Sequence, residues 1–166
     1  MLTSKALSNF GQAIVDTARA NLKSSGKVST GNLYRSLDWS IDVSKETKFT
    51  LEIEMADYGE IIDKGINGTE VSHGSPFSYT NKRPPSSAFD GWSVRKGIAP
   101  RDSKGKFLKR KSLSYIIAKS VFEKGIKPSF FFTKAFNKEF NSLPDEVAFA
   151  YSEDIENIIE ESLRNN

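Results

Sequence analysis

Two hydrophobic periods in a fixed order constrain the fold of this 166-residue chain more than any other feature. Within residues 3–24 the apolar positions recur every four residues, which predicts an amphipathic helix. From Trp39 to Met55 they alternate instead, which predicts two antiparallel strands joined by a polar turn at Lys45–Lys48. An isolated hairpin is marginally stable, so its apolar face needs a helix over it. The pattern predicts an α+β fold, in which a small antiparallel sheet (this hairpin plus one or two strands) packs against a long N-terminal helix.

Capping and turn residues place the shorter elements around this core. Thr3 or Ser4 can cap the first helix, and Gly26 suits the left-handed position that follows it. Thr30 can cap a short helix over 31–37. The segment 57–64 fits either a helical turn or a third strand.

Helical periodicity returns after residue 111 and predicts three further helices. The first is capped by Ser112 or Ser114 and ends before Gly125, the second reaches about Asn141, and the third begins at Pro144. We expect two of the three consecutive aromatics at 130–132 in the core and one at a contact. The residues expected to face inward on the three helices are Leu113, Ile116, Ile117, Val121; Phe132, Ala135, Phe136, Phe140; and Ala148, Tyr151, Ile155, Ile158, Ile159, Leu163.

The middle of the chain, residues 65–111, is rich in glycine and proline and keeps no period. A long irregular stretch in a compact domain is usually functional, disordered or ordered by a partner, and the aromatics here argue against a flexible linker. We therefore predict a single domain over 1–166, with a core of 1–64 and 112–142, a long inserted loop at 65–111 and an acidic C-terminal helix at 144–164. The end of the loop, 101–111, resembles a basic hairpin with Lys104-Gly105 at its tip.

The net charge of +3 hides blocks of opposite sign. Segments 38–80 and 143–166 each carry a net −6, whereas 81–127 carries +10. Such blocks indicate surfaces that meet each other or a neighbouring subunit, although solvated faces with accidental clustering would give the same pattern. The candidate interface residues are Trp92, Arg101, Lys104, Lys106, Phe107, Lys109, Arg110, Lys111 and Phe131.

The residues that most chemistry requires are scarce. There is no cysteine, one histidine (His73) for which a surface or capping role is expected, and no phosphate-binding glycine motif. Asp57, Glu60 and Asp63 would share one face of a helix, yet carboxylates in an acidic block are usually solvated. We therefore expect no metal, no cofactor and no enzymatic activity. No apolar run approaches the roughly 18 residues of a membrane span, and the first residues do not resemble a secretory signal.

Three segments, in this order and spacing, resemble the neck and tail-completion proteins of tailed bacteriophages. They are Thr30-Gly31-Asn32-Leu33-Tyr34-Arg35-Ser36-Leu37, then Ala56-Asp57-Tyr58-Gly59-Glu60-Ile61-Ile62-Asp63-Lys64-Gly65 after the hairpin, and finally Ile126-Lys127-Pro128-Ser129-Phe130-Phe131-Phe132-Thr133-Lys134-Ala135-Phe136. The resemblance covers roughly residues 1–64 and 112–142. The motif positions are Thr30, Gly31, Leu33, Ser36, Tyr58, Gly65, Pro128 and Phe130. Gly59 stands where the family commonly has Ala-Pro, and both 65–111 and the C-terminal helix are longer than usual.

The resemblance implies a structural virion protein without catalysis, forming a ring at the head–tail junction or at the top of the tail. The implied partners are further copies of the chain and neighbouring connector, portal-side or tail-tube proteins, with packaged DNA as a non-specific contact and no membrane. The implied location is the virion neck or tail, after assembly in the cytoplasm of the host bacterium. The alternative prediction is a non-specific DNA-binding protein that uses the basic segment 81–127, whose cations could contact phosphates and whose aromatics could stack on bases.

Overall fold

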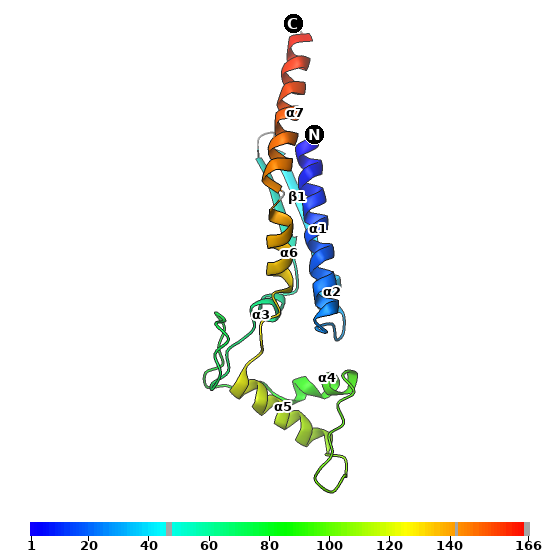
Figure 1. Ribbon diagram of the computed structural model, residues 1–166, viewed down its shortest axis with the longest axis vertical. Helices are drawn as coiled ribbons and strands as arrows, with labels where there is room; N and C mark the ends of the chain where they lie inside the picture. The colour runs from blue at the N-terminus through cyan, green and yellow to red at the C-terminus, as the bar shows by residue number, and fades with distance from the viewer. Residues whose placement is uncertain (46–47, 142, 165–166) are drawn as a thin grey trace. The chain divides into compact units, whose positions relative to one another are not determined.

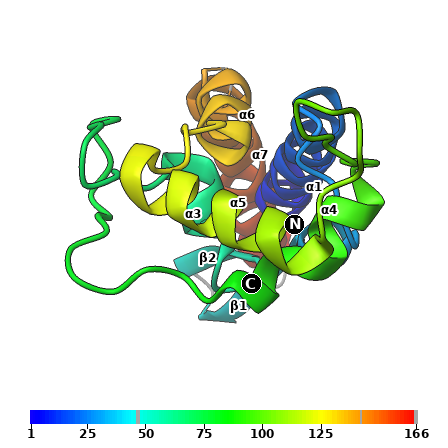
Figure 2. The same ribbon diagram turned by 90° about the horizontal axis from the view of Figure 1, so that it is seen from below.

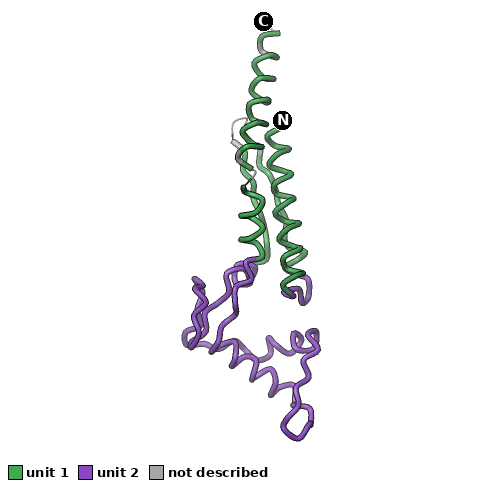
Figure 3. The backbone as a smooth tube through the Cα atoms, in the orientation of Figure 1, with its two compact units in different colours: residues 1–25, 32–56, 131–166 green, residues 26–31, 57–130 purple. Residues whose placement is uncertain are grey.

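The computed structural model of the chain describes residues 1–45, 48–141 and 143–164. It divides into two compact units (Figure 3). Unit 1 comprises Met1–Ser25, Asn32–Ala56 and Phe131–Asn166, and unit 2 comprises Gly26–Gly31 and Asp57–Phe130. The predicted α+β fold is confirmed, with a long N-terminal helix, a two-stranded antiparallel sheet and further C-terminal helices (Figure 1). The units divide the chain differently from the predicted core and inserted loop, because 57–64 and 112–130 fold together with the middle segment.

Helix α1 (Leu2–Ser24) buries the apolar stripe that its sequence period predicts. Phe10, Ile14, Ala18 and Leu22 are all buried, and Gly26 has the expected positive φ of 64°. The predicted cap is wrong, however, because the helix begins at Leu2 and Thr3 lies inside it, 2% exposed. The free amides of its first turn are satisfied by a residue distant in sequence, Asp154.

The hairpin follows the short helix α2 (Asn32–Ser36) and consists of β1 (Asp38–Lys45) and β2 (Lys48–Glu54). Its register places Trp39 opposite Ile53 and Ile41 opposite Leu51, as alternation predicts. Helix α1 covers the hairpin closely, since a Cβ atom at Gly11 would lie 2.9 Å from the Trp39 ring and 3.0 Å from Leu51. Residues 46–47 of the predicted polar turn, and the side chain of Val43, lie outside what the structure describes.

No further strand joins this hairpin in the part of the chain that the structure describes. Of the two alternatives for 57–64, the structure shows a helix, α3 (Gly59–Lys64), which belongs to unit 2. The prediction of one or two strands beyond the hairpin is therefore wrong for the described residues, in which the sheet has two strands.

Helix α6 (Phe131–Phe140) packs against α1 through aromatic rings. Ala135 is fully buried, and the Phe10 ring lies 6.1 Å from Phe136 and 6.4 Å from Phe140, centroid to centroid. The Thr17 hydroxyl on α1 donates to a Glu139 oxygen at 3.0 Å and ties the same two helices together. Phe140 is nonetheless 45% exposed, so its predicted inward position is only partly met.

Helix α7 (Leu143–Arg164) begins at the predicted place but buries a different face from the predicted one. Among its residues with described burial, Ala150 and Asp154 are buried, whereas Ile155, Ile159 and Leu163 of the expected inward stripe are 38%, 54% and 74% exposed. The reason is visible in Figure 1: the C-terminal half of α7 continues beyond the N-terminal end of α1, and none of the described elements of unit 1 lies beside it there.

Unit 2 contains regular structure where the sequence predicts an irregular loop. A 3-10 helix, η1 (Ser86–Phe89), and helix α4 (Asp90–Arg95) pack against α5 (Arg110–Lys124), as Figure 1 and Figure 2 show. The Ser114 hydroxyl on α5 donates to the Asp90 carboxylate on α4, and Ser93 and Ser114 are each 1% exposed. Polar contacts of these serines with Asp90 help to join the elements, and the segment has no apolar period from which they could be predicted.

The start and the inward face of α5 also differ from the predictions. The helix begins at Arg110 after Lys109, without a side-chain cap from Ser112 or Ser114. Leu113, Ser114 and Ala118 form the buried face, and Ile116, expected inside, is 52% exposed.

Candidate interaction surface

A basic loop of unit 2, which we call the basic turn (Arg101–Leu108), is built around the carboxylate of Asp102. Its Oδ1 accepts hydrogen bonds from the backbone amides of Lys104 and Lys106, both at 2.9 Å. Arg101 and Phe107 form an antiparallel bridge, and Gly105 has a φ of 79°. The predicted hairpin with Lys104-Gly105 at its tip is therefore confirmed, although it ends before the predicted Lys111.

The aromatic side chain on this turn is presented to solvent together with a cation. The Arg101 guanidinium lies 3.7 Å from the centre of the Phe107 ring and donates to the Gly105 carbonyl at 2.7 Å. Phe107 is 56% exposed, and Lys104 and Lys106 are exposed beside it. An exposed cation–π pair contributes only about 0.5–1 kcal/mol, so the turn is an accessible basic feature more than a stabilising one.

The first turn of α5 concentrates further positive charge. Lys109 precedes the helix and Arg110 and Lys111 begin it, all three exposed, and no acidic residue lies in that turn. Cations are unfavourable at a helix N-terminus, where the backbone dipole is itself positive. The predicted cations of 101–111 are thus brought to two adjoining places, the basic turn and the start of α5, and both attract anionic groups.

The two aromatic candidates outside the basic turn have different outcomes. Trp92 is half-buried on α4 of unit 2. The prediction that Phe131 lies at an interface is wrong. Its side chain is 1% exposed in the core of unit 1, and its carbonyl accepts a hydrogen bond from the Asn21 side-chain amide at 2.9 Å. The exposed aromatic is its neighbour Phe130, which is 42% exposed and has an unusual positive φ of 52°.

Two of the motif segments that carry the phage resemblance meet in unit 2, although more than 60 residues separate them in sequence. The amides of Ser129 and Phe130 both donate to the Asp63 carbonyl, at 3.1 and 2.9 Å. Gly65, with a φ of 73°, lies so close to Pro128 that a Cβ atom would come within 2.7 Å of the proline nitrogen. We call this contact between residues 62–66 and 126–130 the backbone clasp.

The remaining motif residues take structural positions. The Ser36 hydroxyl donates to the Leu33 carbonyl at 3.0 Å and accepts from the amide of Ala56 at 2.9 Å, which ties α2 to the end of β2. Leu33 is buried, Gly31 has a φ of 80°, Tyr58 is 45% exposed and Thr30 is exposed.

Asn67 organises the segment after the clasp and was not singled out by its sequence pattern. Its side-chain amide donates to the Ser75 carbonyl at 2.7 Å, and its side-chain oxygen accepts from the His73 amide at 2.6 Å. The His73 ring nitrogen Nε2 lies 2.8 Å from the Lys124 carbonyl at the end of α5, which confirms the expected capping role. The Asn67-Gly68 dipeptide was the available signal, since it marks a turn.

The structure does not assemble the carboxylates considered for metal binding. Asp63 is 3% exposed, whereas Asp57 and Glu60 are exposed, and Glu60 pairs with Lys64 at 2.7 Å. Within residues 1–45, 48–141 and 143–164 no group of three acidic or histidine side chains is placed to hold an ion. Among the helices in those same ranges, none combines the length and apolarity that crossing a bilayer requires.

Comparison of the chain with models of known protein families, with curated proteins and with solved structures finds no match.

Proposed function

We propose that this chain is a structural protein of a tailed-bacteriophage virion, which assembles into a ring at the head–tail junction or at the top of the tail. The observation that carries the proposal is the backbone clasp. Two of the three segments whose order and spacing resemble the phage family lie against each other, held by the hydrogen bonds of Ser129 and Phe130 to Asp63. This contact supports the proposal because it joins, more than 60 residues apart in sequence, two parts of the same resemblance.

The distribution of charge supports an assembling subunit. Unit 2 carries 15 basic and seven acidic side chains, a net +8, whereas unit 1 carries nine and 14, a net −5. A chain that presents both signs can associate head to tail, and such association closes into a ring when the rotation between subunits permits. In this role the protein is not an enzyme, and its partners are other copies and the connector, portal-side or tail-tube proteins of the virion neck.

Electron microscopy of the purified full chain tests this function. Samples at high concentration, alone and mixed with portal-side proteins, are expected to show rings or a bound complex. A protein that stays monomeric at every concentration and binds none of the portal-side proteins contradicts the proposal.

A second candidate function, non-specific DNA binding, is favoured by the exposure of the basic turn. Arg101, Lys104 and Lys106 surround the exposed Phe107 ring, the arrangement that contacts phosphates and stacks on a base. Binding of the monomer to duplex DNA, weakening steeply as salt rises, would support it. The absence of binding at low salt would remove it and leave the ring proposal unaffected.

A further inference from the structure

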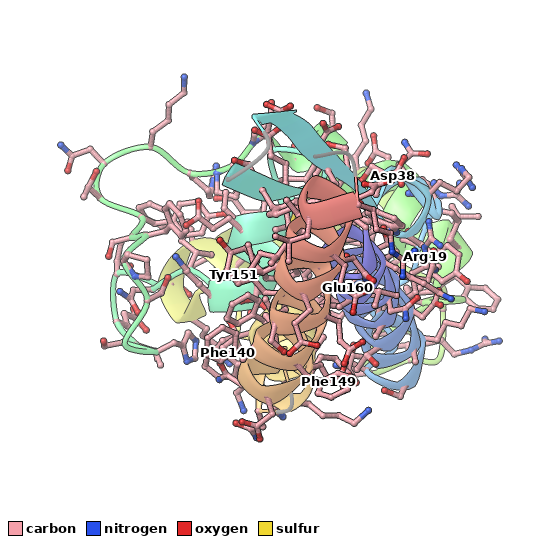
Figure 4. The ribbon with its side chains drawn as sticks, turned by 90° about the horizontal axis from the view of Figure 1, so that it is seen from above. Arg19, Asp38, Phe140, Phe149, Tyr151 and Glu160 are labelled. Atoms are coloured by element: carbon pink, nitrogen blue, oxygen red, sulfur yellow. The ribbon has the colours of Figure 1, made fainter. Side chains whose placement is uncertain are left out.

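The C-terminal half of α7 exposes an apolar stripe with acidic residues along one side. Ile155, Ile159 and Leu163 recur at helical spacing and are 38%, 54% and 74% exposed. Glu156 and Glu160 each follow an isoleucine of the stripe and are exposed as well. Glu160 is labelled in Figure 4, and its 3.4 Å pair with Arg164 involves two largely exposed side chains, so it neutralises little of this charge.

Helix α5 presents the complementary surface. Its exposed face carries Tyr115 and Ile116, 49% and 52% exposed, between the exposed cations Lys111 and Lys119, of which Lys119 forms a partly exposed 3.5 Å pair with Glu123. The Arg83 guanidinium lies 4.4 Å from the centre of the Tyr115 ring, and its hydrogen bond, followed by its charge, lowers the pKa of that phenol. The positive end of the helix dipole and the neighbouring Arg110 add to the charge of this surface.

We propose that the C-terminal half of α7 (residues 155–164) docks on the exposed face of α5 of a second copy of this chain. The proposal rests on the ring function above and names the contact that would join neighbouring subunits. Apolar side chains of the two helices pack together, and Glu156 and Glu160 face Lys111 and Lys119. The contact is between different surfaces, so each copy keeps one free α7 and one free α5, and the association continues from subunit to subunit.

The apolar stripe of α7 could be covered by α5 of a second copy or, more simply, by α7 of a second copy, and charge favours α5. Two copies of α7 paired through the same stripe would bring Glu156 and Glu160 close to the same residues of the partner helix. Like charges at a contact oppose association, whereas α5 supplies the opposite sign. The acidic stripe therefore selects a basic partner surface, and α5 is a basic helix with exposed apolar residues on this chain.

Two charge-reversed proteins test the contact. E156K/E160K makes the α7 surface basic, and K111E/K119E makes the α5 surface acidic. Each variant alone is expected to raise the protein concentration needed for half-maximal association by about tenfold or more, measured by sedimentation velocity. An equimolar mixture is expected to associate as the wild type does, because every α7–α5 contact in an alternating assembly again joins opposite charges. Circular dichroism establishes that both variants are folded.

The matched controls are E52K/E54K on β2 and K27E/K134E, exposed residues outside α5, α7 and the basic turn whose paired reversals change the charge by the same amounts as the two test proteins. Both are expected to associate like the wild type. Association of K111E/K119E at wild-type concentrations overturns the proposal, as does a mixture that stays dissociated. Rings that persist in both reversed proteins would refute this contact and keep the ring function. Open filaments, restored by mixing the reversed proteins, would support the contact and refute the closed ring.

Discussion

A single carboxylate completes the first turn of the longest core helix from more than 150 residues away. Asp154 accepts from the amides of Leu2 and Thr3 at 2.8 and 2.9 Å and from the Thr3 hydroxyl at 2.8 Å. These hydrogen bonds favour the ionised form, those of the Thr3 and Leu2 amides most strongly, and they lower the pKa of Asp154 below its usual value. The carboxylate does for α1 what a local N-cap residue does in other helices.

The lowered pKa of Asp154 predicts a dependence of stability on pH. Because the folded pKa lies below the unfolded value of about 3.9, the contribution is fully present above about pH 4 and is lost as pH falls through the folded pKa. Asp154→Asn is expected to lower the urea midpoint at pH 7 and to reduce its fall below pH 4. Urea titrations from pH 2 to 7 check this, with the exposed Glu156→Gln as control. A variant with the pH profile of the wild type would contradict it.

The neighbouring aromatics Phe130 and Phe131 predict opposite responses to truncation. Phe131 is 1% exposed, so Phe131→Ala leaves a cavity in unit 1 and is expected to cost about 3–5 kcal/mol. Phe130 is 42% exposed, and Phe130→Ala is expected to cost no more than about 1 kcal/mol. Chemical denaturation of both variants measures the difference. Equal losses of unfolding free energy in the two variants would contradict the assignment of Phe131 to the core and Phe130 to the surface.

At the scale of elements, the backbone clasp and the segments beside it require two stretches of backbone to lie very close together. Gly125 follows α5 with a φ of 71°, and a Cβ atom there would collide with the Ile66 carbonyl oxygen and the Gly68 amide nitrogen. Ile66 and Ile126 exchange two backbone hydrogen bonds, of 2.9 and 2.8 Å, at the same place. Glycine is required here for its small size as well as for its positive φ.

Gly97 provides a matched control for this element. It has a φ of 64° but no atom within 4 Å of a Cβ position, so Gly97→Ala bears only the conformational cost of about 1–2 kcal/mol. Gly125→Ala bears the same cost and must also displace backbone atoms, so we expect a loss of at least about 1 kcal/mol more. Urea denaturation of both variants in a Trp39→Phe background, followed by Trp92 fluorescence, compares the two. Equal losses would mean that the clasp yields easily to the added methyl group.

Elements that rest on a local period could be predicted, and those that rest on distant partners could not. The four-residue recurrence in α1 and the alternation at Trp39–Ile53 reflect which side faces a core, so both elements were correctly predicted. The same kind of stripe in α7 led to a wrong prediction of burial. An amphipathic pattern shows that one face is apolar, but it does not show whether an element of the same chain covers that face. Helix α4 was missed because it has six residues and is anchored by Asp90 to Ser114 of α5.

The candidate surface was predictable in its composition and not in its geometry. A run of cations with Lys104-Gly105 in its middle predicts a basic turn, because glycine is a preferred turn residue. The boundary between this turn and α5 was not, because Lys109–Lys111 lack the capping signals that usually mark a helix start. Choosing between Phe130 and Phe131 required their positions in three dimensions, since both are phenylalanines at the start of one helix.

At the scale of the whole molecule, the two units differ in the kind of core that holds them. Among the described residues, the buried apolar side chains of unit 1 include Phe10, Ile14, Leu22, Leu37 and Phe131. Those of unit 2 are Ile66, Leu113 and Ala118, supplemented by buried serines. Burial of apolar surface is the main source of folding free energy, so we expect unit 2 to gain less stability from its core than unit 1 does.

This difference predicts two separate unfolding transitions, and the chain's two tryptophans can report them. Trp39 belongs to unit 1 and Trp92 to unit 2. In Trp39→Phe the remaining fluorescence follows unit 2, and in Trp92→Phe it follows unit 1. We expect the Trp92 signal to change at a urea concentration about 1 M below that of the Trp39 signal. Circular dichroism of both variants against the wild type controls for the substitutions. Coincident transitions would show that the units unfold as one cooperative structure, and the smaller core of unit 2 would then be stabilised by unit 1.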